Sequence, residues 1–198
     1  MISTYNELKS AIGAWLHRDN LAPYIEDFIT VGESRIGREV RSRLQQQRST
    51  ATASTYINLP TDFLQMRALW LTNAGVLTKL QYVTPDALFS LYPSTDTGIP
   101  LHFTIIGDEV RFGPIPSSGF TVELWYFKKL AALSSAVNSL FTSNPDLYLY
   151  AALCAATPFL KNDARIPVWE MQYGMVRDQL NRSEEAGIRT SDMQVVVA

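Results

Sequence analysis

The 198-residue sequence is poor in the side chains from which catalytic and metal sites are commonly built. It contains one cysteine and two histidines, and charged residues make up only 18% of the chain. A single cysteine excludes an intrachain disulfide and a cysteine-based zinc cluster. Cys154 lies in an apolar segment, where a buried and unreactive thiol is expected. His17 and His102 have no cysteine or carboxylate at ligand spacing, so we expect both to be structural or solvated.

Motifs of the common enzyme classes are also missing. The sequence has no HExxH, no GxSxG, no phosphate-binding glycine loop and no GxGxxG. It therefore predicts no catalytic residue, no cofactor and no metal ligand, and it favours a protein that is not an enzyme. A small enzyme whose site is assembled only by folding and a DNA-binding module remain as alternatives.

Two further features are lacking, a strong net charge and a long apolar run. The net charge is -2, which excludes a global basic field that would attract nucleic acid or an anionic membrane. The most apolar segment, residues 147–160, spans 14 residues, fewer than the roughly 18 needed to cross a bilayer. The opening letters MISTYNELKSAIGAW have neither a basic start nor a continuous apolar core, so no signal peptide is predicted.

The N-terminal part of the chain predicts two helices. Thr4 and Glu7 have the spacing of a capping box, and apolar residues follow three and four positions apart. The second predicted helix covers about residues 23–44 and contains Gly32 and Gly37. Each interior glycine costs about 1 kcal/mol relative to alanine. We therefore expect another backbone to approach closely at these glycines, or the helix to bend.

Two more helices are predicted towards the C-terminus. Asn144 is a suitable N-cap, Pro145 suits the first helical position, and Pro158 should kink or end this helix. Because the helix is apolar nearly all round, we expect protein to surround it, in part another subunit. The last helix starts near Asp163 and has an apolar stripe. The residues expected in bundle packing or at a subunit interface are Tyr148, Leu149, Leu153, Trp169 and Tyr173.

Alternating patterns between these helices indicate strands and hairpins. Turns are predicted at residues 73–75 and at Gly107 and Asp108, and a short helix is predicted over residues 84–91. The predicted fold class is α+β: a four-helix bundle formed by the N- and C-terminal helices, with an inserted antiparallel β-rich region. The expected organisation is N-terminal helices 1–48, a β-rich region 49–129, C-terminal helices 130–186 and a flexible tail 187–198.

Five arginines are concentrated near the end of the second predicted helix. Only Glu39 opposes them over that interval. A solvated face that complements the negative helix end is one interpretation. The other is a surface that contacts phosphates or pairs with a neighbouring subunit, because the forked guanidinium suits both phosphates and carboxylates. The residues concerned are Arg35, Arg38, Arg41, Arg43 and Arg48.

Three strings and the order of the elements resemble the head-to-tail adaptor proteins of tailed bacteriophages, including the tail tubular and gatekeeper types. The resemblance runs through about residues 24–180. The strings are YINLPTDFLQMRAL, YPSTDTGIPLHFTIIGDEVRFGPIP and PDLYLYAALCAATPFLKNDARIPVWEMQY. These are structural signatures, so they carry no catalytic residue across.

The resemblance implies a ring, typically a dodecamer, that docks beneath the portal, extends the DNA channel and seats the next tail component. Implied partners are other copies of the chain, the portal protein, a downstream tail or nozzle protein, and double-stranded DNA passing without sequence specificity. No membrane partner is implied. The resemblance places the five arginines at the channel or at a subunit interface, and charge reversal at Arg35, Arg38 and Arg41 is then expected to impair ring assembly or genome retention. The protein is expected in the virion at the head-tail junction, after synthesis in the host cytoplasm. Portal contact is expected through Ile188, Met193, Val195, Val196 and Val197 of the short C-terminal tail.

Overall fold

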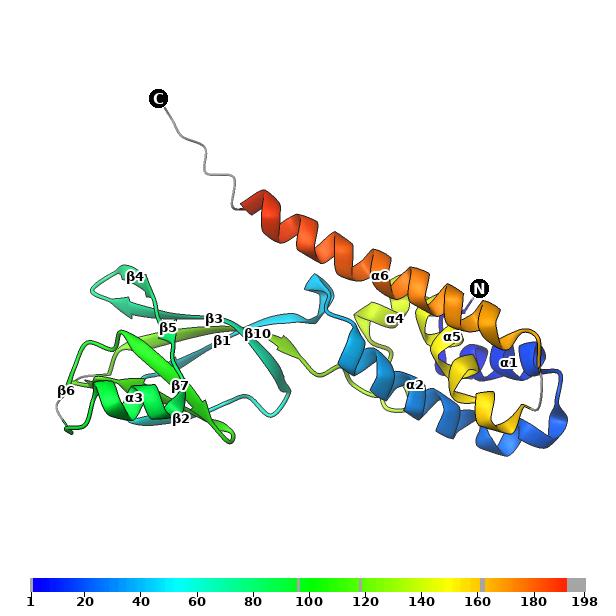
Figure 1. Ribbon diagram of the computed structural model, residues 1–198, viewed down its shortest axis with the longest axis horizontal. Helices are drawn as coiled ribbons and strands as arrows, with labels where there is room; N and C mark the ends of the chain where they lie inside the picture. The colour runs from blue at the N-terminus through cyan, green and yellow to red at the C-terminus, as the bar shows by residue number, and fades with distance from the viewer. Residues whose placement is uncertain (1, 96, 118, 161–162, 192–198) are drawn as a thin grey trace, which may run out of the picture. The chain divides into compact units, whose positions relative to one another are not determined.

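The chain divides into two compact units, which are described separately. The computed structural model describes residues 2–95, 97–117, 119–160 and 163–191 (Figure 1). The helical unit comprises Met1–Gln45 and Leu130–Ala198, and the β unit comprises Gln46–Lys129. The helical unit thus combines both ends of the chain, while the β unit is one continuous segment.

Five α-helices and three short 3₁₀ segments make up the described part of the helical unit. The fifth, α6, is much the longest, and its backbone stays helical beyond residue 186. The elements are α1 (Tyr5–Leu16), η1 (Asp19–Tyr24), α2 (Ile25–Glu39), η2 (Arg43–Gln45), α4 (Ser139–Ser143), α5 (Pro145–Ala155), η3 (Thr157–Phe159) and α6 (Ile166–Ser191).

Helix α1 begins with the predicted capping box. The Thr4 Oγ1 atom accepts a hydrogen bond from the Glu7 amide at 3.2 Å, and Glu7 Oε2 accepts one from the Thr4 amide at 3.2 Å. This reciprocal pair satisfies amides that a helix start would otherwise leave without partners. The helix ends where His17 takes a left-handed conformation, with φ 52°.

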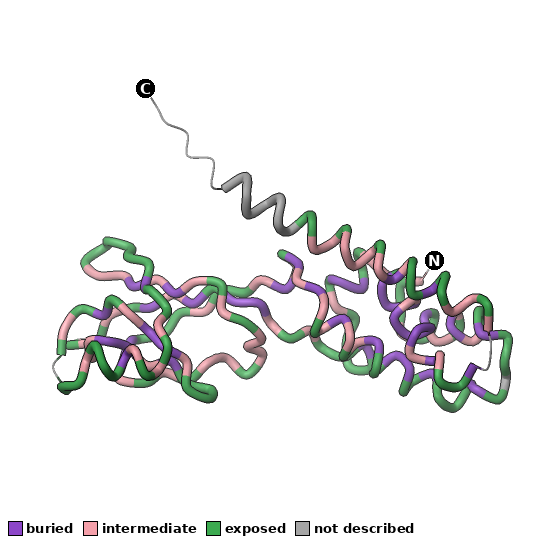
Figure 2. The backbone as a smooth tube through the Cα atoms, in the orientation of Figure 1, coloured by how far each residue is buried: buried purple, intermediate pink, exposed green. Residues whose placement is uncertain are grey.

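Helix α5 is buried by its own chain. It packs against α1, α2, α4 and α6, and most of its residues are buried. Figure 2 colours the backbone by burial. Pro145 occupies the first turn as predicted, and a 3₁₀ turn containing Pro158 follows the helix. The Asn144 side chain makes no capping bond to α5, and its Nδ2 atom donates to the Leu140 carbonyl at 3.4 Å.

Gly32 allows α2 to reach the backbone of α5. A Cβ atom at this position would lie 3.0 Å from the Ala152 nitrogen and 3.1 Å from the Ala151 carbonyl carbon. The close approach predicted for the glycines of α2 is therefore confirmed at Gly32. A Cβ atom on Gly37 would meet nothing within 4 Å, so close packing does not explain that glycine.

In the described residues of the β unit, the strands form two four-stranded sheets and one two-stranded sheet. The strand orders are β1-β10-β3-β4, β2-β8-β7-β5 and β6-β9. A short helix, α3 (Pro85–Leu91), lies in the same unit. The strands are β1 (Gln46–Thr52), β2 (Tyr56–Asn58), β3 (Phe63–Asn73), β4 (Val76–Lys79), β5 (Gln81–Tyr82), β6 (Thr97–Gly98), β7 (His102–Ile106), β8 (Glu109–Gly113), β9 (Ile115–Pro116) and β10 (Thr121–Lys128).

The two larger sheets share one hydrophobic core. The first sheet contributes Leu69 and Leu71 of β3 and Leu124 of β10, and the second contributes Phe103 and Phe112. Both predicted hairpin turns are confirmed. β7 and β8 are joined through Gly107, with φ 61°, and β3 and β4 are joined by the turn that includes Gly75, with φ 83°.

The predicted fold class is wrong in the weight that it gives to the β region and in the direction of two strand pairs. Helices account for 45% of the chain and strands for 28%, so the molecule is mixed α/β rather than a helical bundle with a small β insertion. The described part of the helical unit also contains α4, which was not predicted because a helix this short does not show a helical period in the sequence. The β region is not purely antiparallel either, since β5 pairs with β7 and β6 pairs with β9 in parallel.

Candidate functional site

The structure places the five predicted arginines in different surroundings. Arg35 and Arg38 lie on α2, Arg41 follows it, and Arg43 lies in η2. Arg48 belongs to β1 of the other unit, where its Nη1 atom lies 3.5 Å from Oε1 of a β10 glutamate. Arg38, Arg43 and Arg48 are exposed, whereas Arg35 and Arg41 are half-buried. The group predicted as one surface is thus divided.

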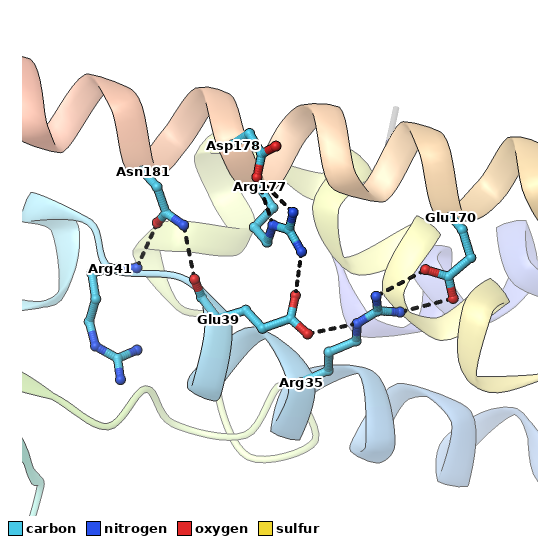
Figure 3. Close-up of polar contacts among 7 residues, drawn as sticks. All are labelled: Arg35, Glu39, Arg41, Glu170, Arg177, Asp178 and Asn181. Atoms are coloured by element: carbon cyan, nitrogen blue, oxygen red, sulfur yellow. Dashed lines mark hydrogen bonds and ion pairs between the residues drawn. The ribbon is translucent and has the colours of Figure 1, made fainter.

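Arg35 joins α2 to α6. Its Nη1 and Nη2 atoms donate to the two carboxylate oxygens of Glu170 at 3.1 and 2.9 Å, and its Nε donates to Glu39 at 3.1 Å (Figure 3). The guanidinium carbon lies 4.2 Å from the ring centroid of Tyr173. A bidentate carboxylate pair and a cation-π contact fix the arginine in one orientation.

Glu39 of α2 connects this network to a second arginine further along α6. The second carboxylate oxygen of Glu39 accepts from Arg177 Nη1 at 3.1 Å, and Arg177 Nη2 lies 2.8 Å from an oxygen of Asp178. One α6 side chain, Asn181, also closes the end of α2. Its Nδ2 donates to the Glu39 carbonyl at 2.9 Å, and its Oδ1 accepts from the Arg41 amide at 3.1 Å, as Figure 3 shows.

These contacts keep the charges of the network in place. The hydrogen bonds from Arg35 lower the pKa of Glu170. Burial acts to raise the pKa of Glu39, but hydrogen bonds from Arg177 and Arg35 outweigh it and lower this pKa. Burial, with the nearby Glu170 carboxylate, raises the pKa of the Cys154 thiol to about 12. The carboxylates are therefore poor general bases, and the thiol is no nucleophile near neutral pH.

Of the two histidines, His102 has a side-chain partner, because its Nδ1 atom lies 2.7 Å from the Tyr92 hydroxyl. His17 ends α1 through its backbone. In residues 2–160 and 163–191, apart from the positions the structure leaves undescribed, no group of three or more His, Cys, Asp or Glu residues could hold a metal ion. The ionic network is thus a clamp between two helices, not a reactive centre.

The exposed side of α6 is a surface that the sequence analysis did not identify. Val168, Met171 and Met175 are 50%, 51% and 57% exposed, at the three- and four-residue spacing that puts them on one face. We call these three residues the α6 outer face. A groove of about 580 Å³ runs beside the two methionines. It is lined by Glu170, Met171, Gly174, Met175, Asp178, Gln179 and Arg182.

The α6 outer face lies opposite a stripe that the sequence does show. Trp169 and Tyr173 of that stripe are buried against the rest of the helical unit. The signal for the outer face was a second apolar stripe, which is easily overlooked in a helix with one strong stripe. A helix with apolar residues on two sides is expected to be covered on both.

The other predicted interface residues lie elsewhere. Tyr148, Leu149 and Leu153 of α5 are buried in the core of their own unit, as are the two aromatic residues of α6 named above. Ile188 falls within α6, where the backbone is helical. The remaining residues predicted to contact the portal fall outside the described part of the chain: Met193, Val195, Val196 and Val197.

In the residues that the structure describes, the polar groups of the site hold helices together. Comparison with family models assigns the chain to a family: residues 3–196 match the model described as SU10 adaptor protein. The chain therefore belongs to the SU10 adaptor protein family, and it is a phage adaptor and a component of the virion that contacts other head or tail components. No curated protein matches the sequence. None of the helices in the described residues is long and apolar enough to span a bilayer.

Proposed function

We propose that this adaptor forms a closed ring beneath the portal, extends the channel through which DNA passes, and seats the next tail component. The α6 outer face carries this proposal. Three large apolar side chains are about half exposed there, and burying them stabilises an association by about 25 cal/mol for each Å² removed from water. A second copy of the chain is the occupant we assign to this face.

A ring requires two different surfaces on every subunit. Each copy presents one surface to the preceding neighbour and another to the following one. The α6 outer face supplies the first surface. Residues of α5 are not available for the second, because they are buried within the chain. Val31 of α2 is 55% exposed on a different helix, and we assign it to neither surface.

The charge of the chain is compatible with a DNA conduit. Tight binding of many phosphates would impede passage, and a net charge of -2 provides no strong attraction. Arg38 and Arg43 are exposed on the helical unit, and Arg48 is exposed on the β unit. We assign these three side chains to DNA or to a neighbouring subunit, and we assign Arg35 to the intramolecular clamp.

The decisive experiment alters the α6 outer face. The double variant Met171→Glu/Met175→Glu puts two carboxylates on that face, and we expect it to fold normally but to lose ring formation on the portal purified from the same phage. The measurement is the mass of the complex by light scattering. Val31→Glu is the matched control, because it introduces one carboxylate at an equally exposed apolar position, and it should assemble like the unchanged protein.

Assembly of the double variant at the unchanged protein's concentration would contradict the role of the α6 outer face. Loss of assembly in Val31→Glu as well would show that α2 contributes to the same contact. Thermal unfolding of all three proteins separates a failure to assemble from a failure to fold.

A further inference from the structure

Arg111 lies against two aromatic rings on the face of the second sheet that points away from the shared core. It belongs to β8, where its neighbours Val110 and Phe112 are part of that core. Because side chains alternate along a strand, Arg111 points to the opposite face. Its guanidinium carbon lies 5.1 Å from the ring centroid of Tyr56 and 4.9 Å from that of Phe89. We call Arg111, Tyr56 and Phe89 the Arg111 cluster.

Two separate elements supply the rings of this cluster. Tyr56 belongs to β2 and lies directly opposite Arg111 in the antiparallel register, which places both side chains on one face of the sheet. Phe89 belongs to α3, which packs against β7 and buries Leu88. Two cation-π contacts restrict the orientations open to the guanidinium. Less conformational entropy is therefore lost when the arginine binds a partner.

The charge of Arg111 has no counterpart within the part of the chain that the structure describes. Arg111 is half-buried, and its side chain makes no hydrogen bond and no ion pair with the described residues. Thr104 of β7 lies opposite it on the other side and is fully buried, and the Thr104 hydroxyl also has no hydrogen-bond partner among these residues. The planar fork of guanidinium donors is therefore free to bind an oxyanion.

The surroundings of the cluster favour a protein carboxylate over the phosphates of DNA. Exposed acidic residues lie on the same elements, Asp86 on α3 and Glu109 on β8, and they repel a chain of phosphates. A single carboxylate can still pair with the guanidinium through two hydrogen bonds. Tyr56 and Phe89 are 41% and 45% exposed, so an apolar group beside that carboxylate would cover them. Aromatic residues and arginine are enriched at the centres of protein interfaces.

We propose that the Arg111 cluster binds a carboxylate side chain, with an apolar side chain next to it, on a segment of a different protein. The carboxylate accepts two hydrogen bonds from the guanidinium, and the apolar side chain packs on Tyr56 and Phe89. Removing water from around the ion pair strengthens it. The same cluster of a second copy would bring two arginines together, which is unfavourable. The inference does not depend on the proposed ring, because every residue involved lies in the β unit.

The test is a selection of displayed random 12-residue peptides on the full-length protein, with counter-selection on Arg111→Lys. Lysine keeps the charge but lacks the planar fork that stacks on rings and pairs with both carboxylate oxygens. We expect enriched peptides to carry Asp or Glu next to an apolar residue. Arg111→Lys should weaken the best synthetic peptide by about tenfold or more. Arg18→Lys, the same change at an exposed arginine of the helical unit, should leave its affinity unchanged.

A second peptide identifies the contact itself. Replacing the acidic residue of the best peptide by its amide should weaken binding to the unchanged protein by about tenfold. The same replacement should have a much smaller effect on binding to Arg111→Lys, because the paired donors are already missing. The four affinities form a double-mutant cycle that isolates the pair. Thermal unfolding of each variant separates a lost contact from a lost fold.

Three outcomes would overturn the proposal. The first is a selection that enriches no peptide with a preference for the unchanged protein over Arg111→Lys. The second is an amide peptide that binds as tightly as the acidic one. The third is that Arg111→Lys abolishes self-association of the protein, or its binding to a short DNA duplex, because the occupant would then be a second copy or DNA.

Discussion

Gly32 is the position at which α2 comes closest to the backbone of α5. The atoms that a Cβ would meet belong mainly to the main chain of a buried helix, which cannot move aside as a flexible side chain would. The glycine thus lowers the helix propensity of α2 but allows the two helices to pack. Gly37 lies on the same helix, and a Cβ atom there would meet nothing within 4 Å. Substitution of Gly37 is therefore a control for substitution of Gly32.

We predict opposite effects for alanine at these two positions. Gly32→Ala should lower the free energy of unfolding by about 1–3 kcal/mol, because it overpacks the contact with Ala151 and Ala152. Gly37→Ala should raise it by about 0.5–1 kcal/mol, because it improves helix propensity without a clash. Urea unfolding at neutral pH measures both values. Equal effects of the two substitutions would refute the packing account.

Arg35 and Arg38 provide a second contrast. Arg35→Met removes two hydrogen bonds to Glu170 and one to Glu39, and it should cost about 2 kcal/mol of unfolding free energy. Arg38 is exposed, so Arg38→Met should change stability by less than about 0.5 kcal/mol. Chemical denaturation of both variants decides the matter. A stable Arg35→Met protein would mean that the network does not hold α6.

At the scale of elements, α6 is held to α2 by groups that respond to acid. Glu39 and Glu170 have a lower pKa in the folded protein than their ordinary value of 4.5. A carboxyl with a lowered folded-state pKa contributes stability that is fully present above its unfolded-state pKa and is lost as the pH falls through the folded-state value. Glu33 acts in the opposite direction, because burial raises its pKa.

We therefore predict that stability falls as the pH drops below about 4.5, and that part of this loss comes from the clamp. The double variant Glu39→Gln/Glu170→Gln should be less stable than the unchanged protein at pH 7 and should lose less stability between pH 7 and about pH 3. Unfolding free energies at both pH values test this. The control, Glu109→Gln in the β unit, should keep the full acid response, and an unaltered response in the double variant would exclude the clamp as its source.

Elements with strong local signals were predictable. The capping box of α1, the short helix α3, and the turns at Gly75 and Gly107 all depend on residues a few positions apart. Strand β1 was harder because QQRSTAT is polar, with no apolar alternation. Helix α2 was predicted to continue to about Leu44, but it ends at Glu39, and the backbone is extended at Val40.

The site was less predictable than the elements, for a physical reason. The sequence drew attention to Arg35 and its neighbours, but the carboxylate that holds Arg35 is 135 residues away along the chain. Counting only the charges that are close in the sequence therefore missed the carboxylate that binds Arg35. The same limitation applies to α5, whose apolar circumference suggested a neighbouring subunit although α1, α2 and α6 cover it.

At the scale of the whole molecule, the chain belongs to a family of phage adaptors. The contact between copies that we propose uses the exposed apolar residues of α6, which belong to the helical unit.

The central claim is that copies of this protein close into a ring on the portal. The most direct test is the mass of the purified protein in solution, alone and mixed with the portal of the same phage. The account predicts that several copies join each portal as one closed ring of defined stoichiometry. A protein that stays monomeric and ignores the portal at every concentration would contradict it.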